Sequence, residues 1–132
     1  MVSTRLQLGT FQIGTPARPQ DGFRIAVTRR PPRGIPKSDW KRIGQFDLWF
    51  PALAPSAELL ARFHPQHQFS PALWKRFLSA YERELLATAK SRQTLALIRE
   101  IAARMPVSIG CFCADESRCH RSRLREVLLR TS

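Results

Sequence analysis

Acidic residues are scarce in this chain of 132 residues. Asp and Glu number 10 against 22 Lys and Arg, which gives a formal net charge of +12. Arginine supplies most of the excess, with 18 residues against four lysines. Because guanidinium groups hold phosphate and carboxylate through paired hydrogen bonds, this composition favours a phosphate-bearing ligand or nucleic acid as partner. An arginine-rich coding bias would produce the same count without any ligand, so composition alone leaves both open.

The chain also lacks a long apolar run. No stretch approaches the roughly 20 apolar residues of a membrane helix, and no apolar signal core follows residues 1–5. Its three cysteines are an odd number and lie within nine positions, a pattern that does not suit the disulfide framework of a secreted domain. We therefore expect an unexported protein without a membrane partner, located in the reducing cytoplasm.

The length and the hydrophobic pattern predict one small α/β domain over residues 1–132, with a short mixed or parallel sheet flanked by helices. Strands are expected at 6–13, 23–28, 46–50 and 107–113. Helices are expected at 56–64, 70–90 and 91–105, capped by Ser56, Ser70 and Ser91, with a last helix starting near Cys119. The helix over 70–90 should bury one face that holds Trp74, Phe77, Tyr81 and Leu85.

The turn between the last strand and the last helix is the first candidate site, because open α/β sheets place ligands at such turns. Cys119 is the candidate nucleophile, since a helix N-terminus lowers the pKa of a thiol. His120 is the candidate proton carrier, and Glu116 is a third candidate catalytic residue. Arg118 and Arg121 would bind an anion there. The structural alternative is that Glu116 and its neighbours cap the helix while Cys119 packs in the core.

A proline-stiffened loop over residues 29–37 is the second candidate site. Arg24 lies before this loop, and the loop itself holds Arg29, Arg30, Arg33 and Lys37. These cations would clamp an anion, facing the turn that holds Cys119. The alternative is a solvated basic loop.

Cys111, Cys113, Cys119 and His120 offer four possible metal ligands, the number that zinc takes. The spacing argues against a metal site, because adjacent residues such as Cys119 and His120 should diverge on a helix. No metal and no cofactor are therefore expected, and burial is expected for Cys111 and Cys113. His64 and His67 are weaker candidates for proton transfer.

Blocks of residues in a fixed order cover most of residues 21–130 and carry a family resemblance. They are 21–29, 32–37, 54–56 with Leu59, Phe63 and His64, then Phe77, Tyr81, Glu84 and Leu85, and finally Cys111, Cys113, Glu116 and 119–121. Together they resemble the domain-of-unknown-function 488 family, in particular its YeaO-like members. Thr28 and Pro31 stand where such proteins usually carry aspartate and tryptophan.

The resemblance implies a small single-domain α/β fold and little about activity. Three functions remain open from the sequence. The first is a phosphate or other anion site in a basic cleft, which an enzyme with a Cys-His pair would use. The second is a nucleic-acid-binding accessory protein without chemistry, and the third is a protein-interaction module.

Overall fold

A four-stranded sheet in the order β1-β4-β2-β3 organises the molecule, and all three strand pairs are parallel. The computed structural model describes residues 5–30, 34–43, 46–63, 70–113 and 119–130. The strands are β1 (Leu8–Gln12), β2 (Phe23–Ala26), β3 (Leu48–Trp49) and β4 (Val107–Cys111). The α/β prediction is confirmed, and the sheet is parallel rather than mixed.

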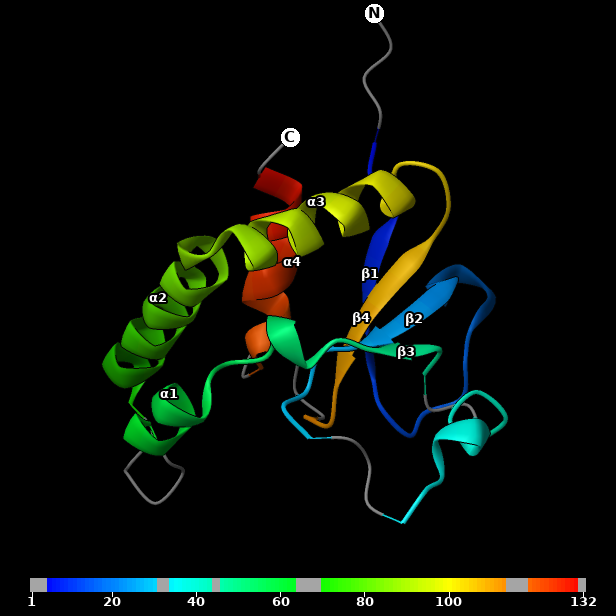
Figure 1. The fold of residues 1–132 in the computed structure, drawn as a ribbon, viewed down its shortest axis with the longest axis horizontal. Helices are drawn as coiled ribbons and strands as arrows, with labels where there is room; N and C mark the ends of the chain where they lie inside the picture. The colour runs from blue at the N-terminus through cyan, green and yellow to red at the C-terminus, as the bar shows by residue number, and fades with distance from the viewer. Residues whose placement is uncertain (1–4, 31–33, 44–45, 64–69, 114–118, 131–132) are drawn as a thin grey trace, which may run out of the picture.

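The helices gather to one side of this sheet (Figure 1). They are α1 (Ala57–Arg62), α2 (Pro71–Ala87), α3 (Ala89–Ala102) and α4 (His120–Arg130), with 3-10 turns at η1 (Pro19–Asp21), η2 (Lys37–Asp39) and η3 (Pro51–Leu53). In the part of the chain that the structure describes, none of them has the length and apolar character needed to cross a membrane.

Side-chain caps set where three of the helices begin. Ser56 and Ser70 accept hydrogen bonds from the backbone N–H groups three residues ahead, as predicted. The third cap differs from the prediction: Thr88 accepts from the N–H of Ser91, because α2 already ends at Ala87 and α3 follows at once.

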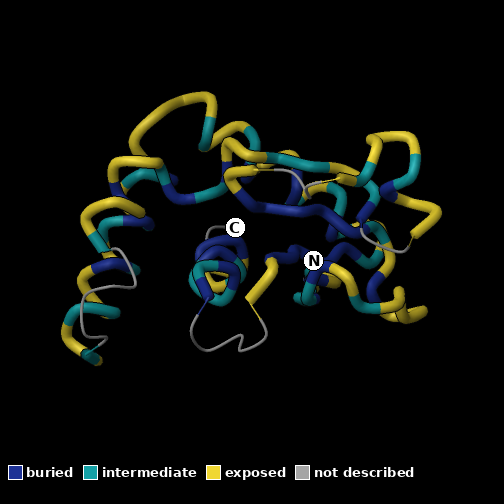
Figure 2. The backbone as a smooth tube through the Cα atoms, turned by 90° about the horizontal axis from the view of Figure 1, so that it is seen from below, coloured by how far each residue is buried: buried dark blue, intermediate teal, exposed yellow. Residues whose placement is uncertain are grey.

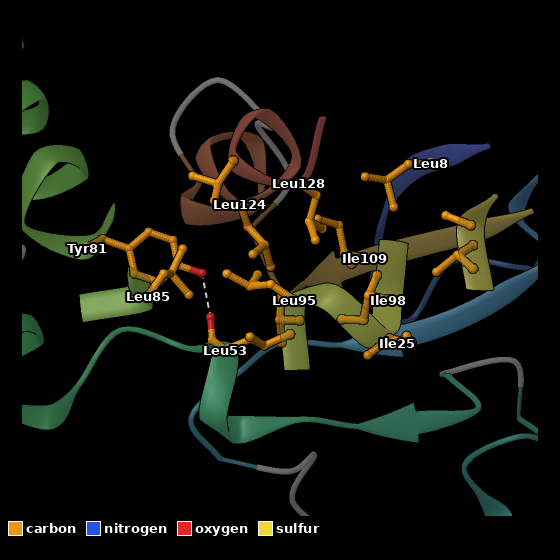
Figure 3. Packing of buried hydrophobic residues seen from close by; sticks show 14 of the residues in the cluster. Leu8, Ile25, Leu53, Tyr81, Leu85, Leu95, Ile98, Ile109, Leu124 and Leu128 are labelled. Carbon is orange, nitrogen blue, oxygen red and sulfur yellow. Dashed lines mark hydrogen bonds between the residues drawn. The ribbon is translucent and has the colours of Figure 1, made fainter. Parts of the chain in front are cut away.

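The main core lies between the sheet and the helices. Ile25 and Ile109 from the strands meet Leu95, Ile98 and Leu124 from α3 and α4 (Figure 3). These side chains are at most 1% exposed. Exposed residues concentrate in the loops and on the outer sides of the helices (Figure 2).

Tyr81 joins the helices to the chain after β3. Its side chain is completely buried, and its hydroxyl donates a hydrogen bond to the carbonyl oxygen of Leu53 in η3 (Figure 3). Burial raises its pKa well above the usual value, so the hydroxyl stays protonated and can keep donating. The predicted core role of Tyr81 is confirmed.

The opposite face of the sheet is covered by loop residues. A second buried cluster there joins Phe11 of β1 to Trp40 and Phe46 of the chain between β2 and β3. The Phe11 ring lies directly over Gly110, where an added Cβ would come within 2.3 Å of it. Glycine at this position of β4 therefore lets an aromatic ring lie against the backbone of the strand.

The free edge of the sheet at β1 is contacted by arginines. Arg125 of α4 donates from Nε to the carbonyl oxygen of Leu8 at 2.9 Å, and Arg18 donates to that of Thr10 at 3.4 Å. The two acceptors are alternate residues of one edge strand and therefore point the same way.

Gly22 is a position that only glycine fits. Its backbone has φ +61° and ψ −128°, and an added Cβ would lie 2.1 Å from the carbonyl oxygen of Pro106. We expect Gly22→Ala to lower the free energy of unfolding by about 3–5 kcal/mol, as the sum of backbone strain and steric overlap. Denaturant unfolding measures this value.

Gly34→Ala is the matched control, because Gly34 also has a positive φ, +75°, but no atom lies within 4 Å of the added Cβ. We expect a loss of about 1 kcal/mol there. Equal losses in the two variants would contradict the packing argument at Gly22.

Candidate functional site

The carboxyl ends of β2 and β4 meet at one edge of the sheet. The two strands are parallel neighbours, and the N–H of Val27, just past β2, donates to the carbonyl oxygen of Gly110 at 2.9 Å. The carbonyl oxygen of Val27 in turn lies 2.7 Å from Nε2 of His120 at the start of α4. The segments that follow β2 and β4 therefore emerge side by side with the beginning of α4, as the ligand edge of a parallel sheet requires.

Three free thiols converge at this edge. Cys111 ends β4 and is 6% exposed, Cys119 precedes α4 and is 1% exposed, and Cys113 is exposed. The sulfur atoms of Cys111 and Cys113 are 3.8 Å apart. This agrees with their spacing of two residues, which places both side chains on one side of an extended chain. Burial of Cys111 is confirmed, whereas burial of Cys113 is wrong.

The thiols differ sharply in acidity. Hydrogen bonds from the thiols of Cys111 and Cys119, with the positive charge of Arg121 nearby, hold the pKa of Cys113 well below its usual range. Hydrogen bonds with the thiols of Cys111 and Cys113, together with burial, raise the pKa of Cys119, and the bond to Cys113 raises that of Cys111. The predicted lowering of the Cys119 pKa is therefore wrong, because this thiol is buried and hydrogen-bonded in its protonated form.

His120 is held in one tautomer. A carbonyl oxygen only accepts, so Nε2 carries the proton that it donates to Val27, and Nδ1 keeps a free lone pair. Nδ1 lies 3.9 Å from the sulfur of Cys119. The Tyr81 ring meets the imidazole edge to face at 5.3 Å. Burial lowers the pKa of His120, which makes the imidazole neutral and able to accept a proton through Nδ1.

Arg121 is buried beside the thiols. Its side chain comes from the first turn of α4, and the residue is 3% exposed. One terminal nitrogen donates to the carbonyl oxygen of Cys113 at 2.6 Å, while Nε has no hydrogen-bond partner in the described part of the chain. Among the residues that the structure describes, no carboxylate pairs with this guanidinium.

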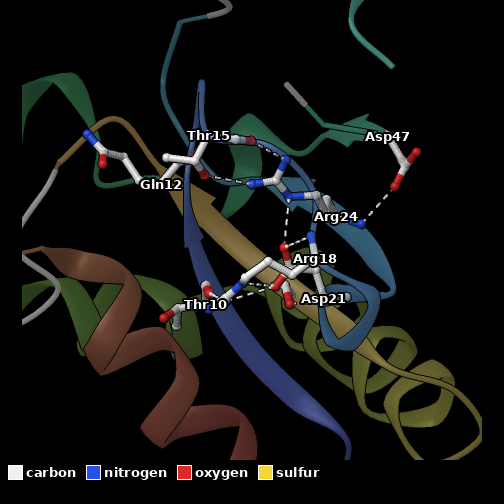
Figure 4. A network of polar contacts seen from close by, with 8 residues as sticks. Thr10, Gln12, Thr15, Arg18, Asp21, Arg24 and Asp47 are labelled. Atoms are coloured by element: carbon white, nitrogen blue, oxygen red, sulfur yellow. Dashed lines mark hydrogen bonds and ion pairs between the residues drawn. The ribbon is translucent and has the colours of Figure 1, made fainter. Parts of the chain in front are cut away.

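The sequence predicts that Arg24 clamps the same anion, but the structure places its side chain on the opposite face of the sheet, against Phe11. It belongs to β2, is 2% exposed, and stacks its guanidinium 3.9 Å from the centre of the Phe11 ring. It also bonds the backbone of Thr15 and pairs with Asp21 at 3.6 Å (Figure 4). Burial of the Asp21 carboxyl is outweighed by hydrogen bonds from Arg18 and by both guanidiniums, so its pKa is lowered. Arg24 thus stabilises the opposite face of the sheet.

The other predicted residues are less constrained. Arg29 and Arg30 are exposed and directly follow the strand end that contacts His120, and Lys37 is exposed in η2. Arg33, Glu116, Arg118, His64 and His67 lie outside the described residues.

Sequence reasoning missed Cys113 as the exposed member of the thiol cluster, and Val27 and Tyr81 as the groups that orient His120. The signal for Cys113 was present, since it lies two residues beyond a buried strand end. The contact of Val27 comes from its carbonyl group, which carries no sequence signal.

An open parallel sheet with thiols, an imidazole and a buried guanidinium at its carboxyl edge defines a small α/β protein. The family model described as the active DUF488-N3 subclade matches residues 8–132. The chain therefore belongs to the DUF488 family, which confirms the resemblance seen in the sequence.

The curated relatives share this family. An uncharacterised protein of Mycobacterium tuberculosis is 34% identical over 110 residues, which is 83% of each chain. The uncharacterised protein YeaO of Escherichia coli is 33% identical over 94 residues, covering 71% of this chain and 72% of its own. No solved structure gives a significant match.

The geometry predicts strong selectivity in thiol alkylation. With iodoacetamide on the native chain near neutral pH, we expect Cys113 to react at least about tenfold faster than Cys111 or Cys119, since it is both exposed and the most acidic thiol. Peptide mass spectrometry after timed quenching measures the three rates. Labelling in denaturant is the control and should make the rates similar; preferential labelling of Cys119 in the native chain would contradict the site geometry.

Proposed function

We propose that the protein binds a phosphate-bearing ligand at the carboxyl edge of β4 and attacks it with the thiolate of Cys113. The observation that carries this proposal is the buried Arg121 guanidinium, whose Nε–H has no hydrogen-bond partner among the described residues and whose neighbour is an exposed thiol of lowered pKa. A nucleophile and an anion-binding group side by side are the minimum that group transfer to or from an anion requires.

Among the residues that the structure describes, no carboxylate compensates the charge of Arg121, which favours an anion as ligand. Burying an ion without a counter-ion costs several kcal/mol, and an incoming anion would offset that cost. Phosphate has the right charge for this guanidinium and can accept hydrogen bonds from the backbone N–H groups of a helix start. Exposed Arg29 and Arg30 follow the adjacent strand end and add positive charge along the approach.

The chemistry would be a transfer of the phosphoryl group. The sulfur of Cys113 forms a bond to phosphorus while the bond from phosphorus to the leaving oxygen breaks, and that oxygen takes a proton from water. A second water then cleaves the sulfur–phosphorus bond and returns the thiolate. Cys119, the nucleophile expected from the sequence, is buried instead, and His120 holds a proton-accepting Nδ1 3.9 Å from its sulfur. Glu116 and Arg118 remain candidate contributors from the connecting loop.

Substitution of the two central residues tests the proposal with p-nitrophenyl phosphate as substrate. We expect Cys113→Ser to abolish turnover, because a hydroxyl is not ionised at neutral pH. Arg121→Gln should weaken phosphate inhibition about 10–100-fold, the value of one or two charged hydrogen bonds. Release of p-nitrophenol measures both.

The matched control is Arg125→Gln, one turn along α4, whose Nε is bound to the carbonyl oxygen of Leu8 and which should keep full activity. Turnover that survives in Cys113→Ser, or an Arg121→Gln variant with unchanged phosphate inhibition, would overturn the proposal. A cytoplasmic location belongs to the same proposal, because a reducing compartment keeps the three thiols free.

A second candidate function, binding of single-stranded nucleic acid, is favoured by a basic groove between α1 and α2. The groove has a volume of about 590 Å³. Its lining includes four cations, namely Arg62, Lys75, Arg76 and Arg83, with Phe63 and Ser79 between them. Cations along a groove contact successive phosphates, and an aromatic ring offers a stacking surface for a base.

Salt dependence tests this groove. Four phosphate contacts should give a slope of about −3 in the plot of log affinity against log salt concentration for an oligonucleotide. We expect the double substitution Arg76→Gln and Arg83→Gln to halve that slope. Arg104→Gln, whose native partner is Glu100 at 2.7 Å, is the control. A slope that stays the same in the double variant would exclude the groove as the binding surface.

A further inference from the structure

We propose that Cys111, Cys113, Cys119 and His120 form a binding site for a zinc-class metal ion, and that the ion closes the thiol site when bound. The metal-binding inference depends only on the arrangement of these four side chains and not on the proposed phosphoryl transfer. It reverses the expectation drawn from the sequence, in which Cys119 and His120 diverge along a helix.

Three of the four donor atoms lie at ligand distances from one another, and the fourth lies close to one of them. The sulfurs of Cys111 and Cys119 and Nδ1 of His120 are all within 4.8 Å of each other. The sulfur of Cys113 is 3.8 Å from that of Cys111. Two sulfurs on a tetrahedral zinc ion with bonds of about 2.3 Å are about 3.8 Å apart, so this pair needs no rearrangement.

The divergence expected for adjacent helical residues does not arise, because Cys119 is not part of the helix. α4 begins at His120, and Cys119 precedes it in the connecting segment. The backbone at Cys119 is therefore free to direct its sulfur toward Nδ1 of His120, at 3.9 Å.

The orientation of His120 is the arrangement that metal-binding histidines adopt. One ring nitrogen of such a histidine usually donates to a carbonyl or carboxylate, which fixes the tautomer and directs the other nitrogen to the metal. Here Nε2 donates to the carbonyl oxygen of Val27 at 2.7 Å, and Nδ1 is the nitrogen that lies within the thiol cluster.

The charge of the complex fits its surroundings. Three thiolates and a neutral imidazole around a divalent cation carry one net negative charge. Arg121, 3% exposed and bonded to the carbonyl oxygen of Cys113, supplies one positive charge beside it. Soft sulfur donors with one imidazole select zinc-class ions over magnesium or calcium, which prefer oxygen.

Metal binding would use the exposed thiol of Cys113 as a ligand. Cys113 is the accessible member of the cluster, so its coordination completes the tetrahedron and removes the nucleophile from solution. The ion would thereby protect the three thiols from modification and would reversibly block nucleophilic attack by Cys113.

Titration of the reduced, metal-free chain with cobalt(II), followed by displacement with zinc(II), tests the inference. We expect one equivalent of cobalt to produce thiolate charge-transfer absorption and the intense visible bands of a tetrahedral ion, both erased by zinc. Cys113→Ser should lose one thiolate's share of the charge-transfer intensity. His120→Asn should weaken zinc at least as much as loss of an outer-shell partner does, about 10–100-fold, in competition with a chromophoric chelator.

Phe112→Ser is the matched control, since Phe112 lies between two of the ligands and is 48% exposed; its spectrum and affinity should equal those of the native chain. A native chain without thiolate charge transfer, or zinc affinity unchanged in His120→Asn, would overturn the inference. Zinc should also block iodoacetamide labelling of Cys113, whereas turnover of p-nitrophenyl phosphate by the metal-free chain reports on the proposed function alone.

Discussion

The position of β4 between two parallel neighbours is the constraint on which the rest of the structure depends. With β1 on one side and β2 on the other, β4 hydrogen-bonds along both edges and directs its carboxyl end to the same edge of the sheet as β2. Cys111 ends this strand, and the return of the chain into α4 brings Cys119 and His120 back to it. The chemical character of the site thus follows from topology, since the parallel direction of β2 and β4 brings the carbonyl group of Val27 to His120 and the thiols.

Two buried arginines, Arg24 and Arg121, differ in how far neighbouring groups compensate their positive charge. Arg24 has an aromatic ring, a carboxylate and a backbone carbonyl around it, so its charge is compensated within the fold. Within the described part of the chain, Arg121 has a carbonyl partner but no carboxylate and no aromatic ring around its guanidinium. Both are equally hidden from water, and a sequence shows no difference between them. The contrast explains why a high net charge by itself says little about function. The structure shows which arginine has its charge neutralised by neighbouring groups and therefore stabilises the fold.

The sequence predicts the fold well because its signals are local. Ser56 and Ser70 cap the helices that they were expected to cap, and the helical spacing of Phe77, Tyr81 and Leu85 identifies the buried face of α2. The sequence predicts where the candidate site lies but not which of its cysteines is exposed. Whether Cys119 or Cys113 is exposed depends on where α4 begins, and helix ends are the least certain part of any such prediction. Arg24 was misplaced because alternation along a strand gives two faces without saying which of them leads to the ligand edge.

The arginines at the β1 edge have a consequence for self-association. An edge strand offers unpaired carbonyl and amide groups on which another polypeptide can dock and extend the sheet. Here the alternate carbonyls of Leu8 and Thr10 are already occupied by Arg125 and Arg18, and the far edge is β3, only two residues long. Guanidinium groups therefore occupy the β1 edge of the sheet, and the β3 edge is too short to pair with a long strand. Neither edge offers much backbone on which a second polypeptide could extend the sheet.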